Sequence, residues 1–373
     1  MNTTILNWND TDHVAIYQKQ LKEQPLYYDP NLKIWVAYSY AYCKALLLNT
    51  DVQVPVPAIG DDSPLNDKAK LLLRNMARVS NDAQHVASHE AAMLIYRRFS
   101  QAPVSEVLET LLDETDIREF DWVEVVCKQL PIRLILKRLG FNEADSSYIS
   151  INLAALLRIM LPNKTADDIK MITQVTDGYY EIAEKYVDSL ALPVDEKTKE
   201  LIVCNLIGLF IQCYDAGRGL LCNTFLNLLR HNNKMRAGKV DDSFYKELVD
   251  ETLRHDPPVH NTRRLAVVDI SLGGQTIKAG ETVMIVLAAA NLDPEVFNNP
   301  RQFDIMRDNN DKHLTFGLGG HNCLAKYFSI DMAAEACRYI ADKYPSTRLL
   351  QNEFTYEPQL NVRLVKELVV SLC

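Results

Sequence analysis

Apolar residues recur at helical spacing along most of this chain. The pattern i, i+3, i+4, i+7 appears over 11–21, over 41–48 and then repeatedly from 82 to 343. Alternating apolar and polar positions, which are typical of strands, are confined to 25–38 and 264–287, each around a turn signal. The sequence therefore predicts a fold that is mainly α with small β-sheets.

The helical segments follow one another without an obvious break. A chain of 373 residues is long enough for two domains, but no Gly-, Ser- or Pro-rich linker divides it and no internal repeat is visible. Single folds of this size are common. We expect one domain over residues 1–373, with its β-rich patches at about 25–38 and 264–287.

Composition narrows the classes of protein that this chain fits. Hydrophobic residues make up 47% of the sequence, and no apolar run approaches the ~20 residues that cross a bilayer. The first ten residues lack the basic flank and apolar stretch of a signal peptide. A net charge of −9 with dispersed Lys and Arg argues against nucleic-acid binding. We expect a cytoplasmic protein that binds neither membrane nor nucleic acid.

One of the eight cysteines has a distinctive chemical context. Cys323 lies in a glycine-punctuated loop, His313-Leu-Thr-Phe-Gly-Leu-Gly-Gly-His-Asn-Cys323, directly before a long helical pattern. Glycines allow the backbone to approach a flat ligand closely, and the N-terminus of a helix favours a thiolate. The alternative is a buried structural cysteine in a turn. The loop favours a metal-bound thiolate at Cys323.

The spacing Phe-Gly-x-Gly-x-His-x-Cys-x-Ala resembles the haem-binding signature of the cytochrome P-450 superfamily. The matching positions are Phe316, Gly317, Gly319, His321, Cys323 and Ala325. The resemblance implies that Cys323 is the proximal thiolate ligand of haem b (iron protoporphyrin IX), a ligand that helps cleavage of the O–O bond. It also implies the family's triangular, mostly helical fold, and it places the chain with the soluble bacterial members.

Two further segments extend the resemblance over nearly the whole chain. Residues 120–140 look like the family's mid-chain helix that ends in Leu-Gly, and residues 290–307 look like its loop before the haem.

A charged motif in the second half also resembles the family. Glu251-Thr-Leu-Arg254, followed by Pro257-Pro258, matches the Glu-x-x-Arg helix, and Arg307 matches the third member of its buried network. Such a pair alone is weak evidence, because Glu335-Ala-Cys-Arg338 has the same spacing. The resemblance assigns Glu251, Arg254 and Arg307 to the scaffold of the cysteine loop.

Haem carries two propionates, and a site that buries them needs cations or N–H donors. The resemblance points to His85 and His89, to Arg264 and to His321. His89 stands where the family usually has arginine, so its charge depends on pH. The alternative for His85 or His89 alone is an ordinary helix histidine.

The apolar segment 206–225 should be the family's long helix over the haem. Counting back from Glu251 places Ala216 where the oxygen-activating threonine normally stands, with Asp215 as the preceding acid and Gln212 one turn earlier. Alanine cannot donate a proton, so Gln212, a substrate hydroxyl or a water near Asp215 would replace the missing alcohol. The alternative is that Ala216 is an ordinary core residue.

The resemblance implies a monomeric haem-thiolate monooxygenase that acts on a small organic molecule, such as a secondary-metabolite intermediate. Electrons would come from a ferredoxin-type donor and its reductase. The alternatives are a peroxide-driven or redox-neutral enzyme, and a haem-binding docking or sensing protein without oxygen chemistry. Substrate contacts are expected from 52–70, from 152–176 and near Val259-His260, which carry no recognisable chemical code.

Overall fold

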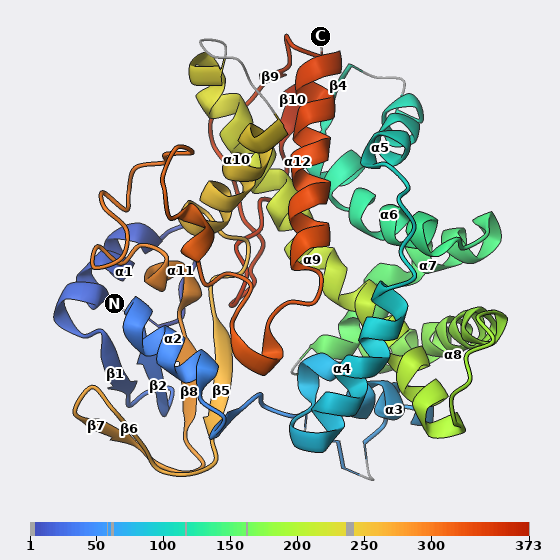
Figure 1. The fold of residues 1–373 in the computed structure, drawn as a ribbon, viewed down its shortest axis with the longest axis horizontal. Helices are drawn as coiled ribbons and strands as arrows, with labels where there is room; N and C mark the ends of the chain where they lie inside the picture. The colour runs from blue at the N-terminus through green and yellow to red at the C-terminus, as the bar shows by residue number, and fades with distance from the viewer. Residues whose placement is uncertain are drawn as a thin grey trace. The chain divides into compact units, whose positions relative to one another are not determined.

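The computed structural model describes residues 4–57, 59–60, 63–115, 118–161, 163–235 and 242–372. Helices dominate, so the mainly α fold with small sheets is confirmed (Figure 1). The chain forms two compact units: unit 1 is Met1–Gln53, Val104–Lys128 and Asp215–Cys373, and unit 2 is Val54–Pro103 and Gln129–Tyr214. The expectation of a single domain stays a prediction.

Unit 1 contains all the strands that the structure describes. Its helical elements are α1 (His13–Glu23), α2 (Tyr40–Leu48), α5 (Val104–Asp113), the π-helical turn η2 (Val123–Cys127), α10 (Asp242–His255), α11 (Leu287–Ala290), η4 (Asn310–Lys312), η5 (Gly319–His321) and α12 (Lys326–Lys343). Its strands are β1 (Leu26–Asp29), β2 (Ile34–Ala37), β3 (Val52–Gln53), β4 (Glu119–Asp121), β5 (Thr262–Ala266), β6 (Ile270–Leu272), β7 (Gln275–Ile277), β8 (Thr282–Ile285), β9 (Arg348–Leu349) and β10 (Val369–Ser371).

The largest sheet has the order β1-β2-β8-β5-β3. β1 and β2 form the hairpin that the sequence predicts, because Asp29 Oδ1 accepts the N–H groups of Asn31 and Leu32 and so closes the turn. β8 pairs parallel to β2 and antiparallel to β5, which joins the two predicted β patches in one sheet. A hydrophobic cluster that includes Val283 and Ile285 packs with it.

A two-stranded ribbon, β6 and β7, turns at Gly273-Gly274 as the alternation predicts. Both glycines have positive φ, 57° and 74°, which suits the tight turn of a hairpin. A Cβ at Gly273 would also meet the hydroxyl of Tyr42 at 2.7 Å, so a larger residue there would require Tyr42 to move.

The prediction of a single helix over residues 120–140 is wrong. Phe120 lies in β4, where it pairs with Val370 of β10, and a π-helical turn follows it. α6 (Leu130–Leu139) is a new helix with Pro131 in its first turn, where the missing N–H costs no hydrogen bond. Gly140 ends α6 with φ 76°, so the Leu-Gly ending is observed.

All the regular elements that the structure describes in unit 2 are helices, and loops connect them. It comprises α3 (Asp67–Asn75), η1 (Ala77–Val79), α4 (Asp82–Tyr96), α6, α7 (Glu143–Leu157), η3 (Arg158–Met160) and α8 (Ala166–Ser189). α8 begins with a capping box, in which Thr165 and Asp168 satisfy each other's backbone N–H groups.

α9 (Glu196–Met235) is the longest helix, and the boundary between the units falls inside it. Between Glu196 and His231 it is long and apolar enough to cross a membrane by length and composition, contrary to our reading of the sequence. However, 61% of that apolar window is buried within the protein. α9 therefore has the character of a core helix.

Gly219 allows α9 to pass close to the backbone at Pro258. A Cβ at Gly219 would meet Pro258 Cβ and Leu364 Cδ2, both at 2.6 Å. We expect Gly219→Ala to lower the free energy of unfolding by ~1–2 kcal/mol, because overpacking outweighs the helix propensity of alanine. Gly208→Ala on the same helix is the control, since its Cβ meets only the flexible Met76 side chain and Gln212 Nε2, at 3.1–3.4 Å. Equal denaturation midpoints for the two variants would contradict this account.

Candidate functional site

The loop before α12 turns sharply at two glycines. Gly317 and Gly319 have φ of 69° and 71°, a region that favours glycine. A Cβ at Gly319 would approach Leu47 O to 2.9 Å, so the loop lies against the end of α2. The N–H of Cys323 donates to Phe316 O at 2.9 Å, which closes the loop below the sulfur. Cys323 is half-buried.

α12 begins slightly later than the sequence pattern indicates. Its first residue is Lys326 and its N-cap is Ala325, so Cys323 lies in the turn before the helix. The Lys326 ammonium lies 5.8 Å from the centroid of the Phe316 ring. The helix N-terminus and this cation both lie near Cys323 in the chain and favour a negative charge there.

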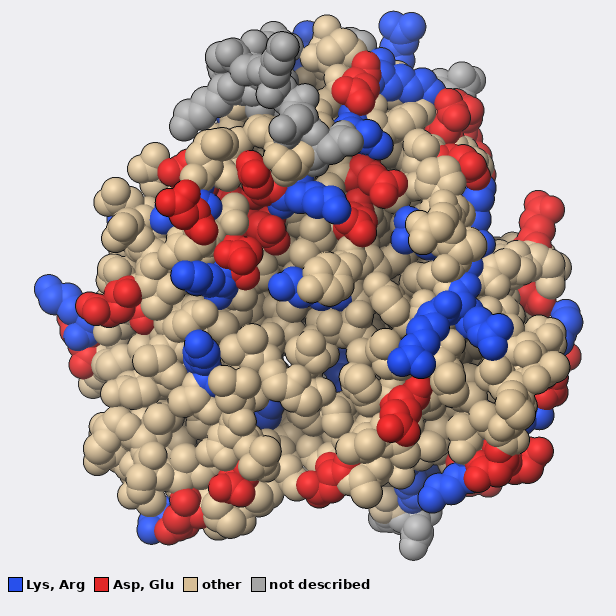
Figure 2. All heavy atoms as spheres, viewed as in Figure 1, with Lys and Arg blue, Asp and Glu red and all other residues tan. Residues whose placement is uncertain are grey.

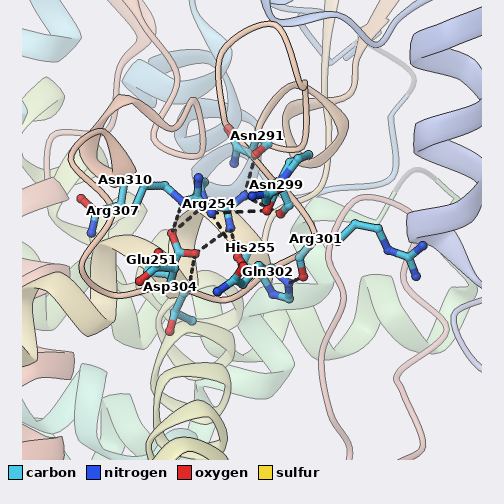
Figure 3. Close-up of polar contacts among 12 residues, drawn as sticks. Glu251, Arg254, His255, Asn291, Asn299, Arg301, Gln302, Asp304, Arg307 and Asn310 are labelled. Carbon is cyan, nitrogen blue, oxygen red and sulfur yellow. Dashed lines mark hydrogen bonds and ion pairs between the residues drawn. The ribbon is translucent and has the colours of Figure 1, made fainter. Parts of the chain in front are cut away.

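Glu251 and Arg254 form a fully buried ion pair on α10 (Figure 3). Arg254 Nε donates to Glu251 Oε2 at 2.7 Å, and Nη2 donates to Oε1 at 2.6 Å. This bidentate geometry is the strongest form of a carboxylate–guanidinium contact. The remaining N–H groups of Arg254 donate to backbone carbonyls of Asn291, Pro300 and Gln302.

Arg307 lies beside the same carboxylate, with its Nε 3.6 Å from Glu251 Oε2. Its guanidinium also donates to Asn298 O and Gln302 O. The N–H of Asp304 donates to Glu251 Oε1 at 2.8 Å. The structure therefore brings Glu251, Arg254 and Arg307 together, and the three hold the irregular segment 298–304 by its backbone.

Asn291 connects this cluster to the cysteine loop. Its side chain donates to Leu253 O on α10 and to Thr315 Oγ1, and it accepts the N–H of Leu314 at 2.7 Å. Thr315 Oγ1 also donates to Leu253 O at 2.6 Å. α10 thus contacts the start of the loop that ends at Cys323 through buried hydrogen bonds.

Arg264 projects from the middle of β5 and is only 6% exposed. Its Nη1 donates to Thr262 Oγ1 and to Arg263 O, and in the part of the chain that the structure describes it has no carboxylate partner within ion-pair distance. Burial lowers the pKa of this guanidinium. A buried cation without a counter-ion is costly, so this position fits an anionic ligand group.

His85 and His89 belong to unit 2, one turn apart on α4. Their ring centroids are 5.7 Å apart. His85 Nδ1 donates to Ala77 O at 2.9 Å. Burial, and then the neighbouring His85, lower the pKa of His89. His321 lies in unit 1, in the turn η5 just before Cys323.

Gln212, Asp215 and Ala216 all lie on α9, as expected. The carboxamide of Gln212 donates to Gly208 O at 3.0 Å, so its N–H group is engaged along its own helix. Asp215 forms an ion pair with Arg218 one turn later. Sequence analysis missed Arg218, although Asp-x-x-Arg at i and i+3 on a helix is a readable signal.

The residues of unit 1 fit a haem group. Cys323 supplies a half-buried thiol in a tight glycine-containing loop, and Arg264 supplies a buried cation with no carboxylate at ion-pair distance among the described residues. Haem needs one axial ligand of this kind and partners for its propionates. When bound, it would supply the electron-transfer and oxygen chemistry that the side chains lack.

Comparison with known proteins agrees with this geometry. The profile of the cytochrome P450 family matches residues 243–333, which contain both Glu251 and Cys323. The biotin biosynthesis cytochrome P450 of Bacillus subtilis is 35% identical over 177 residues, which are 48% of this chain and 45% of that protein. This alignment thus spans less than half of that relative. Cytochrome P450 119 of Sulfolobus acidocaldarius is 27% identical over 95% of this chain and 98% of its own length.

Solved structures share the fold over nearly the whole chain. P450BioI, in complex with an acyl carrier protein ligated by hexadec-9Z-enoic acid, matches with a TM-score of 0.83 at 23% identity and covers 97% of this chain and 99% of its own. CalO2 matches with a TM-score of 0.84 at 20% identity and covers 99% of both chains. The chain belongs to the cytochrome P450 family of oxidoreductases, whose members hold haem through a cysteine thiolate.

Proposed function

We propose that this protein is a cytoplasmic haem-thiolate monooxygenase that oxidises a small organic molecule with O2 and electrons from a ferredoxin-type donor. The observation that carries the proposal is the half-buried Cys323 in a loop that is closed by the hydrogen bond to Phe316 O and turned by Gly317 and Gly319. Cytochrome P450 monooxygenase PikC of Streptomyces venezuelae, 27% identical over 91% of this chain, supports a role in secondary metabolism.

In this proposal Cys323 holds the iron, and Phe316, Gly317 and Ala325 line the loop against the ring. Arg264, His321, His85 and His89 neutralise the propionates. Arg264 contributes most to this, because it is buried and no carboxylate of the described residues lies within ion-pair distance of it. Glu251, Arg254 and Arg307 keep the loop in place from α10 and take no part in the reaction.

The distal residues are assigned to proton supply. The Asp215 carboxylate delivers the proton. Ala216, which has no hydroxyl, leaves room for a hydroxyl of the substrate beside it. Gln212 would release its bond to Gly208 O in order to donate a hydrogen bond. Substrate contacts come from 52–70, 152–176 and Val259-His260, of which residues 58, 61, 62 and 162 lie outside the described residues.

A basic group of side chains on unit 2 is suited to an acidic electron donor. Arg97 and Arg98 are exposed at the end of α4, where Figure 2 shows Lys and Arg side chains gathered. Such a group steers a negatively charged partner and makes association depend on ionic strength.

A peroxide-driven enzyme is the second candidate, and the lack of a hydroxyl at Ala216 favours it. Turnover with hydrogen peroxide alone, compared with turnover with NADPH and reductases, separates the two. A haem protein without oxygen chemistry would give no oxidised product with either.

The first prediction concerns the iron ligand. Cys323→His should abolish the thiolate-type band in the spectrum of the ferrous carbon monoxide complex, because imidazole replaces the sulfur. Cys213→Ser is the control, since Cys213 lies on α9 and its thiol donates to Phe210 O in the same helix. A thiolate-type band that survives in Cys323→His would disprove the assignment.

The second prediction concerns haem retention. Arg264→Ala should release haem to an acceptor such as apomyoglobin at least tenfold faster, because one propionate loses a charge-assisted bond of ~1.5–3 kcal/mol. Arg263→Ala on the same strand is the control, since Arg263 is exposed. Equal transfer rates for the two variants would refute a propionate role for Arg264.

The third prediction concerns the buried charges. Glu251→Gln should lower the free energy of unfolding by ~3–5 kcal/mol and yield little haem-loaded protein, because Arg254 keeps a buried charge without its partner. Glu335→Gln, in the second Glu-x-x-Arg sequence, should change stability by less than ~1 kcal/mol. Full haem loading of Glu251→Gln would contradict the scaffold role.

A further inference from the structure

Arg218 is a buried cation on α9 with acidic partners from two parts of unit 1. Its side chain is 8% exposed, its Nε lies 3.1 Å from Asp215 Oδ1, and its Nη1 lies 3.8 Å from Glu357 Oε1. Both carboxylates are partly exposed, at 37% and 29%. A buried guanidinium is stable only when paired, so α9 and the segment around Glu357 each supply part of its counter-charge.

The segment 356–365 packs against α9 at Gly219, the residue after Arg218. Gly219 follows Arg218, and a Cβ there would meet Leu364 Cδ2 at 2.6 Å. The N–H of Glu357 donates to Leu364 O at 2.9 Å, so Glu357 and Leu364 face each other across the segment. The contact at Gly219 therefore fixes how far Glu357 lies from Arg218.

The same segment reaches the residues assigned to the substrate. Val362 pairs with Val259, and the N–H of His260 donates to Asn361 O at 2.9 Å. Asn261 Nδ2 donates to Leu360 O at 3.1 Å. His260 is itself buried and bonded to Tyr17, whereas Val259 is half-buried, so a molecule that contacts Val259 would lie beside the segment that carries Glu357.

Other ionisable groups near Arg218 are already paired or neutral. Burial raises the pKa of the Cys127 thiol, which forms a hydrogen bond with Cys222 and lies near Asp121. Burial also raises the pKa of Tyr356. Arg363 is paired with Asp256 at 2.8 Å, and its guanidinium covers the Tyr356 ring. Among the described residues, Asp215 and Glu357 both lie within ion-pair distance of Arg218.

We propose that Arg218 is a positioning residue that holds the Asp215 carboxylate and couples it, through Glu357, to the segment 356–365. This inference rests on the proposed role of Asp215 in proton supply. Glu357 competes with Asp215 for one cation and repels its negative charge. A displacement of 356–365 by substrate changes that competition, so substrate binding sets how readily Asp215 takes up a proton.

Arg218 and Glu357 act in opposite directions on the charge of Asp215, and this difference gives a sharp test. Removing the charge of Glu357 leaves Arg218 to Asp215 alone and favours the Asp215 anion. Removing the charge of Arg218 disfavours that anion. We expect the titration midpoint of Asp215 to fall by ~0.5–1 pH unit in Glu357→Gln and to rise by ~0.5–1 pH unit in Arg218→Met, since both carboxylates are partly solvated.

The measurement is carbon-13 NMR of protein labelled at aspartate Cγ, in the diamagnetic ferrous carbon monoxide form. The Asp215 signal is assigned by its loss in Asp215→Asn. Glu353→Gln is the control, an exposed glutamate of the same region. If Arg218→Met does not fold, Glu357→Gln decides alone, because its side chain is partly exposed. A midpoint in Glu357→Gln equal to that in Glu353→Gln would overturn the coupling.

Peroxide release separates failure of this inference from failure of the proposed function. Substrate-free holoprotein is reduced by a surrogate ferredoxin and its reductase, and hydrogen peroxide is measured against pH. An unchanged profile in Asp215→Asn would sink the role of Asp215 itself. A changed profile in Asp215→Asn, with no opposite shifts in Glu357→Gln and Arg218→Met, would sink the coupling alone.

Discussion

The buried ion pair of Glu251 and Arg254 is the constraint on which unit 1 depends most. Neither side chain is exposed, and removing two charges from water costs several kcal/mol for each ion. The cost is offset only if every polar atom of the pair has a partner. Those partners are backbone groups of 291, 300, 302 and 304, a segment without regular structure. The pair therefore determines the path of a segment that has no hydrogen-bond ladder of its own.

The geometry at Cys323 follows from that path. Asn291 is the first of the residues whose backbone the ion pair binds, and its side chain bonds both to α10 and to the first residues of the cysteine loop. Positive φ at Gly317 and Gly319 then brings the backbone round to Cys323. The helix α10, the buried amide of Asn291 and the two glycines thus position the sulfur of Cys323. Precise ligand sites require such support from rigid elements.

Local signals were read correctly where they act over a few residues. The Asp29 turn, the glycine pair of the β6–β7 ribbon and the Leu-Gly end of α6 all depend on neighbours in the chain. Residues 120–140 were read wrongly because Phe120 pairs with Val370 of β10. The apolar spacing at the start of this segment is compatible with a helix or a strand, and the pairing with β10 makes residues 119–121 a strand, whereas residues 123–127 are helical.

The class of the fold and the family could both be predicted from the sequence, because they depend on periodicity and on a compact motif of fixed spacing. The sequence also identified Glu251, Arg254 and Arg307 as a group. The packing of distant segments was needed to show that Arg264 is a buried cation with no carboxylate at ion-pair distance among the described residues, and that Arg218 is paired with both Asp215 and Glu357. The periodicity of a sequence indicates which face of a helix or strand is buried. The partner of a buried charge cannot be predicted in this way, because it comes from whichever distant segment packs against that charge.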